Sequence, residues 1–304
     1  MTLQVGAFSV GLASGAYFVS AVPLLGELYP ESVGRVVGIH GMASQLAAVV
    51  VPTLAVWLLT QATWRAVFWL LAAAALVVTL LLTVVADGSS VPENADADRD
   101  FLGALADWRL ILLGVVMVAA LGFVWQGLFN FYVTYMTTVK ELSPATAGTM
   151  LTVVFAAGVP AFWLSGRLAD RLPNVPYILA IHLAFVVCLV ALTVVSWRAA
   201  LFVVTAAIGY VVHSVFPALD TYVLGIFPAE NRGAAYAVFS GTALLIEAGG
   251  SGALGILTEA GFEFDAVFLA FAGALTVVLV GLAGLYVVGV FPTSASESGT
   301  VERS

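Results

Sequence analysis

The stretch GRLADRLPN, residues 166–174, decides the fold, because it places Arg167, Asp170 and Arg171 within five residues and lies between long apolar runs. The chain has 304 residues, of which 62% are hydrophobic and 9% are charged, and its mean hydropathy is +1.09. A soluble domain carries about 25% charged residues. This chain lacks the charge to cover a water-exposed surface, so we expect an all-α membrane protein in which residues 166–174 form a loop at the membrane surface.

The apolar runs are long enough to cross a bilayer. A spanning helix needs roughly 20 apolar residues, because the hydrocarbon core is about 30 Å thick. The runs do not alternate between apolar and polar residues as barrel strands do, and in lipid a helix satisfies its own backbone hydrogen bonds. The sequence predicts nine transmembrane helices, at residues 3–28, 34–59, 64–86, 108–138, 144–166, 175–197, 199–227, 233–258 and 264–290.

One long polar connection divides the chain. Residues 87–107 are acidic and rich in small residues, which is typical of a flexible linker. We therefore expect a partial N-terminal bundle of three helices at 1–86, the linker at 87–107, a six-helix bundle at 108–292 and a tail at 293–304.

The positions of arginine and lysine predict the orientation in the membrane. If the helices alternate in direction, more basic residues fall on the side of the linker than on the opposite side, and basic residues are enriched on the cytoplasmic side. We expect a multi-pass protein of the plasma membrane with the linker and the C-terminus in the cytoplasm. The linker side holds Arg35, Arg99, Arg109, Arg167, Arg171, Arg232 and Arg303, and the opposite side holds Arg65, Lys140 and Arg198.

The two ends of the chain resemble each other. With a shift of 200 residues, AVFWLLAAAALVV at 66–78 falls on AVFLAFAGALTVV at 266–278, with seven identical positions. The turn-containing stretches VGRVVG at 33–38 and NRGAAY at 231–236 also correspond. The first three helices thus resemble the last three, whereas the middle three have no counterpart. Such a repeat predicts that about 90 further residues, or three helices, precede Met1.

Two six-helix repeats joined by a cytoplasmic linker resemble the major facilitator superfamily of secondary transporters. The stretch 166–174 is similar to the signature loop of that family, glycine-x-leucine-alanine-aspartate-arginine, and departs from it only at its Pro-Asn ending. The resemblance implies that the nine helices correspond to helices four to twelve of twelve. The matching residues are Gly166, Leu168, Ala169, Asp170 and Arg171, together with the turn at Pro228, Arg232 and Gly233 and the pair Trp64–Arg65.

The resemblance also implies a conformational latch at the cytoplasmic surface. In the family, the loop aspartate accepts hydrogen bonds from the free N–H groups at the start of the eleventh helix, which here begins near Gly233, and complements that helix dipole. Arg35 is expected to have no partner, because the corresponding first-half loop is missing. The alternative is a solvated turn that only marks the cytoplasmic side. The expected latch residues, whose arginines would add ion pairs, are Gly166, Arg167, Asp170, Arg171 and Arg232.

Ionisable side chains at membrane depth are candidates for coupling. A charge there costs about 2.5–3.5 kcal/mol on insertion scales, and a carboxylate in a low dielectric can exchange protons near neutral pH. Glu247 and Asp220 are the expected proton-coupling residues, with structural hydrogen bonds as the alternative role. His213 is seven residues before Asp220 and therefore lies on the same helix face, together with Tyr210.

Other polar residues are expected along the substrate pathway. Gln126 and Asn130 are spaced i, i+4 on one helix face and suit a polar solute, and the resemblance places Ser14 and Tyr17 at the same cavity. The predicted pathway residues are therefore Gln126, Asn130, Tyr210, His213, Ser14 and Tyr17. We expect His40, Ser44 and Gln45 to make contacts between helices, and His182 to be a satisfied or lipid-edge histidine.

These features predict a secondary active transporter that works by alternating access, with proton-coupled uptake of a small solute. The alternatives are efflux by proton antiport and a truncated membrane protein without transport activity. Segment 41–55 lacks the glycine pattern of drug–proton antiporters, which favours uptake. GSGALG at 250–255 lies inside a predicted helix, so it indicates close helix packing and not a dinucleotide site. The expected partners are a small solute, the lipid bilayer and protons. We expect no enzyme activity and no cofactor, metal or nucleic acid.

Overall fold

The structure is a computed structural model that describes residues 2–85, 103 and 105–292. The expected tail at 293–304, most of the expected linker at 87–107, and with them Arg99 and Arg303, lie outside the described residues. Within the described part, nine helices are long and apolar enough to cross a membrane, which confirms the predicted fold class. They are α1 Thr2–Leu28, α2 Val33–Gln61, α3 Arg65–Val85, α5 Trp108–Thr138, α6 Pro144–Ala169, α7 Asn174–Val194, α8 Arg198–Ile226, α9 Arg232–Glu259 and α10 Phe264–Val287.

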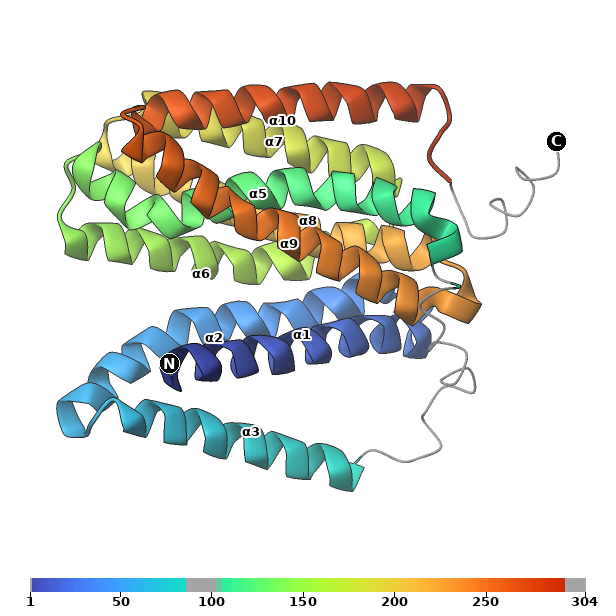
Figure 1. Cartoon of the computed structure of the whole chain (residues 1–304), viewed down its shortest axis with the longest axis horizontal. Coiled ribbons are helices and arrows are strands. Elements are labelled where there is room, and N and C mark those ends of the chain that lie inside the picture. Colours follow the sequence, from blue (N-terminus) through green and yellow to red (C-terminus); the bar gives the residue numbers. More distant parts are fainter. Residues whose placement is uncertain (1, 86–102, 104, 293–304) are drawn as a thin grey trace.

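The helices run along one common direction and form two groups, which we call the first bundle (α1–α3) and the second bundle (α5–α10) (Figure 1). The turns at 29–32, 170–173 and 227–231 lie at one end of the molecule, together with the end of α3 and the start of α5. We call this the linker end. The turns at 62–64, 139–143, 195–197 and 260–263 lie at the opposite end.

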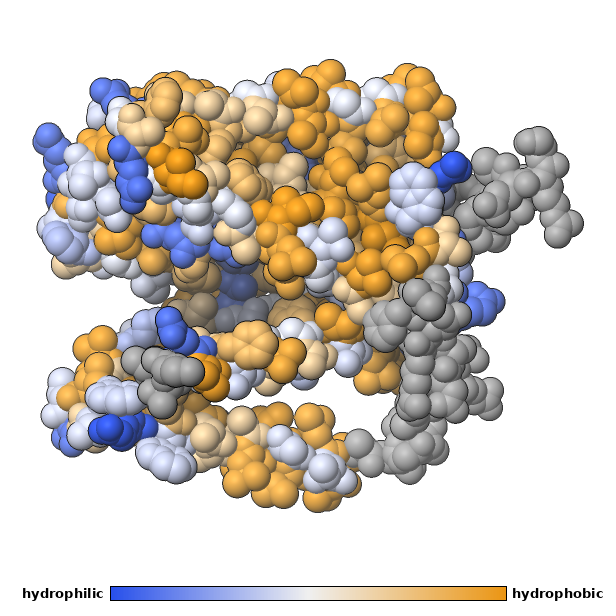
Figure 2. Space-filling model, in the orientation of Figure 1, coloured by the Kyte–Doolittle hydropathy of each residue, from blue (hydrophilic) through white to orange (hydrophobic). Residues whose placement is uncertain are grey.

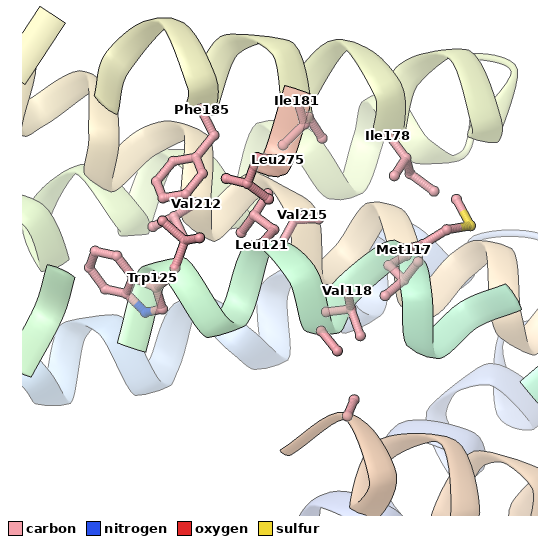
Figure 3. Close-up of a cluster of buried hydrophobic side chains, with 14 of the residues drawn as sticks. Met117, Val118, Leu121, Trp125, Ile178, Ile181, Phe185, Val212, Val215 and Leu275 are labelled. Carbon is pink, nitrogen blue, oxygen red and sulfur yellow. The ribbon is translucent and has the colours of Figure 1, made fainter. Parts of the chain in front are cut away.

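The second bundle has a continuous apolar core. Met117, Leu121 and Trp125 project from α5 toward α7, where Phe185 is fully buried, and toward side chains of α8 and α10 (Figure 3). These three positions on α5 recur at four-residue spacing, so they share one helix face. A core on this scale makes the second bundle a stable frame for side chains on its inner surface.

Helix α6 is longer than the sequence predicted at its linker end. It begins with Ser143 as N-cap, whose hydroxyl accepts from the N–H of Thr146, and with Pro144 in its first turn. It then continues through Gly166 to Ala169, so the first four residues of GRLADRLPN are helical and Asp170 stands at the C-cap. The predicted loop is therefore only the short turn 170–173, because Arg167, Leu168 and Ala169 are good helix formers.

The two bundles touch at the linker end and separate toward the opposite end (Figure 1). At the linker end, the backbones of α2 and α6 meet directly: a Cβ atom on Gly34 would overlap the carbonyl oxygen of Gly166, and one on Gly38 would overlap that of Phe162. In the rest of α2, beyond Gln45, the residues are largely exposed or half-buried. The absence of side chains at these glycines is what lets the two bundles meet at one end.

Candidate functional site

A cavity of about 500 Å³ lies between the bundles. Its wall is built from α1 and α2 on one side and from α5, α6, α8 and α9 on the other. The space-filling view shows the corresponding hollow between the two bundles, while apolar side chains cover much of the outer surface (Figure 2). The volume falls in the range of about 300–1,000 Å³ that is usual for small-molecule sites.

Glu247 of α9 lies in this wall and is only 6% exposed. Its side chain packs over Gly122 of α5, where an added Cβ would overlap the carboxyl group. No hydrogen bond or ion pair joins its carboxyl group to another of the described residues. Burial of a carboxylate without a partner is costly, so this group is held at the cavity by packing and not by a polar contact.

Asp220 of α8 is the second acidic group of the wall. The buried hydroxyl of Tyr236 on α9 donates a hydrogen bond to its carboxylate, with 2.9 Å between the oxygens. Tyr236 also lines the cavity. Asp220 is therefore held by one neighbour, and the two acidic groups of the wall differ in their hydrogen bonding.

His213 of α8 stands in a group of aromatic rings. Its ring centroid lies 5.9 Å from those of Trp125, Phe155 and Phe162, and 6.4 Å from that of Phe216. Its Nδ1 lies 2.6 Å from the carbonyl oxygen of Gly209. A carbonyl oxygen can only accept, so Nδ1 carries the proton and the ring needs no positive charge to make this contact.

The structure brings most of the predicted pathway and proton-coupling residues together on the cavity wall. Gln126, Ser14 and His213 line it, as do Glu247 and Asp220. So do His40, Ser44 and Gln45, for which the sequence suggested only contacts between helices. The Oε1 atom of Gln45 is buried without a hydrogen-bond partner among the described residues.

Three predicted pathway residues are not among the residues that line the cavity: Asn130, Tyr210 and Tyr17. The Asn130 amide donates to the carbonyl oxygen of Gln126, one turn earlier on the same helix, and its side chain is exposed. Tyr17 is 55% exposed, and its ring packs near His40, with 5.7 Å between the centroids. Each of the three lies one helical turn from a residue that does line the cavity, namely Gln126, His213 or Ser14. A shared helix face therefore does not by itself bring a side chain to the cavity.

His182 is buried, at 1% exposure, and its Nδ1 lies 2.9 Å from the carbonyl oxygen of Ile178. Its Nε2 has no hydrogen-bond partner among the described residues. It belongs to the packing of α7 and does not line the cavity.

Sequence reasoning missed the aromatic part of the wall. Aromatic residues are common in transmembrane helices, so no single one stands out, and the one signal on α5 was the i, i+4 spacing of Trp125 and Phe129. The lining aromatic residues are Phe18, Trp125, Phe129, Phe155, Phe162, Phe216, Tyr236 and Phe239.

A second polar arrangement lies at the linker end. The Asp170 carboxylate accepts hydrogen bonds from two backbone N–H groups in the first turn of α2, from Gly34 at 2.8 Å and from Arg35 at 2.9 Å. These are free donors of a helix N-terminus, and the negative charge also complements the helix dipole. Asp170 stays exposed on its outer side. We call this arrangement the bundle latch, because it joins the second bundle to the first.

The partner of Asp170 differs from the expected one. The resemblance implied that Asp170 would cap the helix that starts near Gly233, but the structure places its carboxylate on the start of α2, where it accepts from the backbone N–H groups of Gly34 and Arg35. The reason is the direct backbone contact between Gly34 and Gly166, which brings the end of α6 to α2.

The arginines near the latch are arranged differently from the expected ion pairs. The guanidinium of Arg167 stacks over the ring of Trp163, 3.6 Å from its centroid. Nη1 of Arg167 and Nε of Arg232 are buried without hydrogen-bond partners among the described residues. Arg171 and Arg232 line a pocket of about 720 Å³ at the linker end, together with Asp170.

Two bundles of membrane-spanning helices around a central cavity are the arrangement typical of a membrane transporter. A sequence profile of the Major Facilitator Superfamily matches residues 2–212, and the chain belongs to this family. Among solved structures, the chain is similar to one titled as the crystal structure of a Major Facilitator Superfamily transporter, FucP, in the outward conformation. The TM-score is 0.65 at 14% identity, over 87% of this chain and 71% of that one, and this likeness shows the fold. No curated protein matches.

Proposed function

We propose that this chain is a secondary active transporter that takes a small solute into the cell across the plasma membrane by alternating access, coupled to protons. The observation that carries the proposal is the cavity between two bundles that meet at one end only, with Glu247 and Asp220 in its wall. A midplane site between two rocking bundles is the general arrangement of such transporters.

The conformation described here corresponds to an outward-facing state if the linker end is cytoplasmic. Among the described basic residues, Arg35, Arg109, Arg167, Arg171 and Arg232 lie at the linker end, against Arg65, Lys140 and Arg198 at the opposite end. The basic excess supports a cytoplasmic linker end. The cavity would then open outward, and the bundle latch would hold the cytoplasmic side closed.

Coupling requires a group that is protonated in one step of the cycle and deprotonated in another. The two carboxylates of the wall are the acidic candidates, and their protonation would remove the charge that makes it costly to close a low-dielectric site around them. Asp220 also has a hydrogen bond that depends on its charge. The bond donated by Tyr236 favours the charged form of the carboxylate, so protonation of Asp220 would weaken this bond between α8 and α9.

The sequence of α2 supports uptake as the direction of transport. Segment 41–55 of α2 has Val51, Leu54 and Ala55 where drug–proton antiporters of the family carry glycines. This departure supports uptake over efflux. A measurement of direction is therefore part of the test.

The test is solute flux in proteoliposomes with an imposed pH gradient across a panel of sugars, amino acids, amines and carboxylic acids. We expect one class to accumulate only when the gradient points inward, and we expect Asp220→Asn and Glu247→Gln to alter this dependence. Glu259→Gln is the matched control, because Glu259 is an exposed acid at the end of the helix that carries Glu247.

Each outcome is informative. Accumulation that follows the outward gradient would replace uptake by antiport. Transport that ignores the gradient, or is altered equally by the Glu259→Gln control, would remove the proton-coupling assignment. Absence of flux for every class would contradict the proposed activity of this chain.

A further inference from the structure

The cavity wall carries acidic groups and no lysine or arginine among the described residues that line it. Its titratable members are Asp220 and Glu247, with His40, His213 and Tyr236. The proton on Nδ1 of His213 is used in its bond to Gly209, and Tyr236 donates to Asp220. The fixed charge that a bound solute meets is therefore negative, which opposes an anion and attracts a cation.

Glu247 is placed where it could act as the counter-ion of a positively charged ligand. It is 6% exposed, it lines the cavity, and no described residue forms a hydrogen bond or an ion pair with it. The carboxyl group occupies the space that a side chain at Gly122 would fill, and it packs directly against the backbone of α5. A buried acceptor without a partner is stabilised when a positive ligand pairs with it.

Aromatic rings form the remainder of a cation site. Trp125 packs against Phe129, with 5.5 Å between the ring centroids, and Phe129 packs edge-on against Phe155 at 5.7 Å. Phe162 and Phe216 are stacked at 5.9 Å. Ring faces attract cations, and the same rings accommodate apolar groups. A small, strongly hydrated solute would leave most of this surface without a partner.

We propose that the solute of this transporter is an organic cation with an apolar body, whose charge pairs with Glu247 and whose body lies against the aromatic rings of α5, α6 and α8. The inference rests on the proposed function, since it names the solute class of the same cavity. It also divides the roles of the two carboxylates: Glu247 holds the solute, and Asp220, with its partner Tyr236, carries the coupling proton.

The test is equilibrium binding, which needs no transport. Tetraphenylphosphonium and tetraphenylborate have nearly the same size and shape and opposite charge, so they separate charge from apolar contact. Dissociation constants of both probes are measured by equilibrium dialysis on the purified full chain in detergent, for the parent protein, Glu247→Gln, Glu247→Asp and the control Glu259→Gln. Comparing variants for one probe at a time cancels its partition into micelles.

We expect Glu247→Gln to weaken the binding of tetraphenylphosphonium at least tenfold and to leave or improve that of tetraphenylborate. Glu247→Asp should retain part of the affinity for the cation, and Glu259→Gln should change neither probe. Size-exclusion profiles identify a variant that fails to fold, in which case the Glu247→Asp variant carries the test. Equal losses for both probes, or a loss of the same size in Glu259→Gln, would overturn the proposal.

The two proposals fail in distinguishable ways. Gradient-driven uptake of a neutral or anionic solute, without charge-selective binding, would remove the cation inference and leave the transport function standing. Charge-selective binding without any flux would remove the proposed transport function and leave the cation site standing.

Discussion

The bundle latch can be tested by removing the charge of Asp170. In Asp170→Asn, the remaining amide oxygen can still accept one of the two hydrogen bonds from Gly34 and Arg35, while the other bond and the negative charge at the α2 N-terminus are lost. A hydrogen bond to a charged group contributes about 1.5–3 kcal/mol, and a charge at a helix terminus about 0.3–1 kcal/mol. Because Asp170 is exposed on one side, we expect the lower part of this range.

The expected loss is therefore about 1–2 kcal/mol, which corresponds to a shift of about 5- to 30-fold toward the state open at the linker end. Asp170→Ala removes both hydrogen bonds and should shift the equilibrium further. The matched control is Glu230→Gln, which removes an equal charge from an exposed side chain in the turn at the same end.

The assay is the rate at which a membrane-impermeant maleimide labels a cysteine in the cavity from the linker side. Cys188 is the free cysteine of the chain and is replaced first, and Ser240→Cys then places the label site in the cavity wall. We expect the Asp170 variants to label about 5- to 30-fold faster from the linker side, and Glu230→Gln to label at the parent rate. Equal rates for Asp170→Asn and the parent would show that Asp170 is a solvated turn residue and no latch.

Three further predictions concern packing and positioning. Gly122→Ala should push the Glu247 carboxyl group away and lower cation binding more than tenfold with little change in thermal stability, and unchanged binding would show that the close packing does not position Glu247. Gly250→Val should separate α9 from α5, where an added Cβ would overlap the backbone of the facing helix, and lower the free energy of unfolding by about 1–3 kcal/mol; an unchanged melting temperature would refute the contact. Tyr135→Phe should remove the hydrogen bond of 2.5 Å to Asp265 and lower the free energy of unfolding by about 1–2 kcal/mol in a melting experiment, whereas a more stable variant would contradict this role.

Much of the candidate site could be predicted from the sequence, because an ionisable residue inside a membrane costs free energy and is therefore rare there. Glu247, Asp220 and His213 stand out in apolar helices for this reason, and all three line the cavity. The aromatic wall gave no comparable signal, because an aromatic residue costs nothing in lipid and Phe155 or Phe216 looks the same on a lipid-facing and on a cavity-facing side. Asn130 was placed in the pathway from its spacing with Gln126, and Tyr17 from the family resemblance. Neither lines the cavity, because each lies one helical turn away from the residue that does.

The sequence by itself determined the class of this protein. Nine apolar runs of spanning length are too hydrophobic for a soluble protein and lack the alternation of barrel strands, so they predict transmembrane helices. Hydrophobicity is a local property, and it can be determined from the sequence residue by residue. It also marked GRLADRLPN as a charged turn at the membrane surface. Only the tertiary structure decided which helix the turn meets. That choice depends on the approach of two backbones, where Gly34 of α2 and Gly166 of α6 leave no side chain between them. Contacts across 136 residues follow from such packing and from no local pattern, so the partner of Asp170 and the position of Glu247 over Gly122 became visible only in the folded chain.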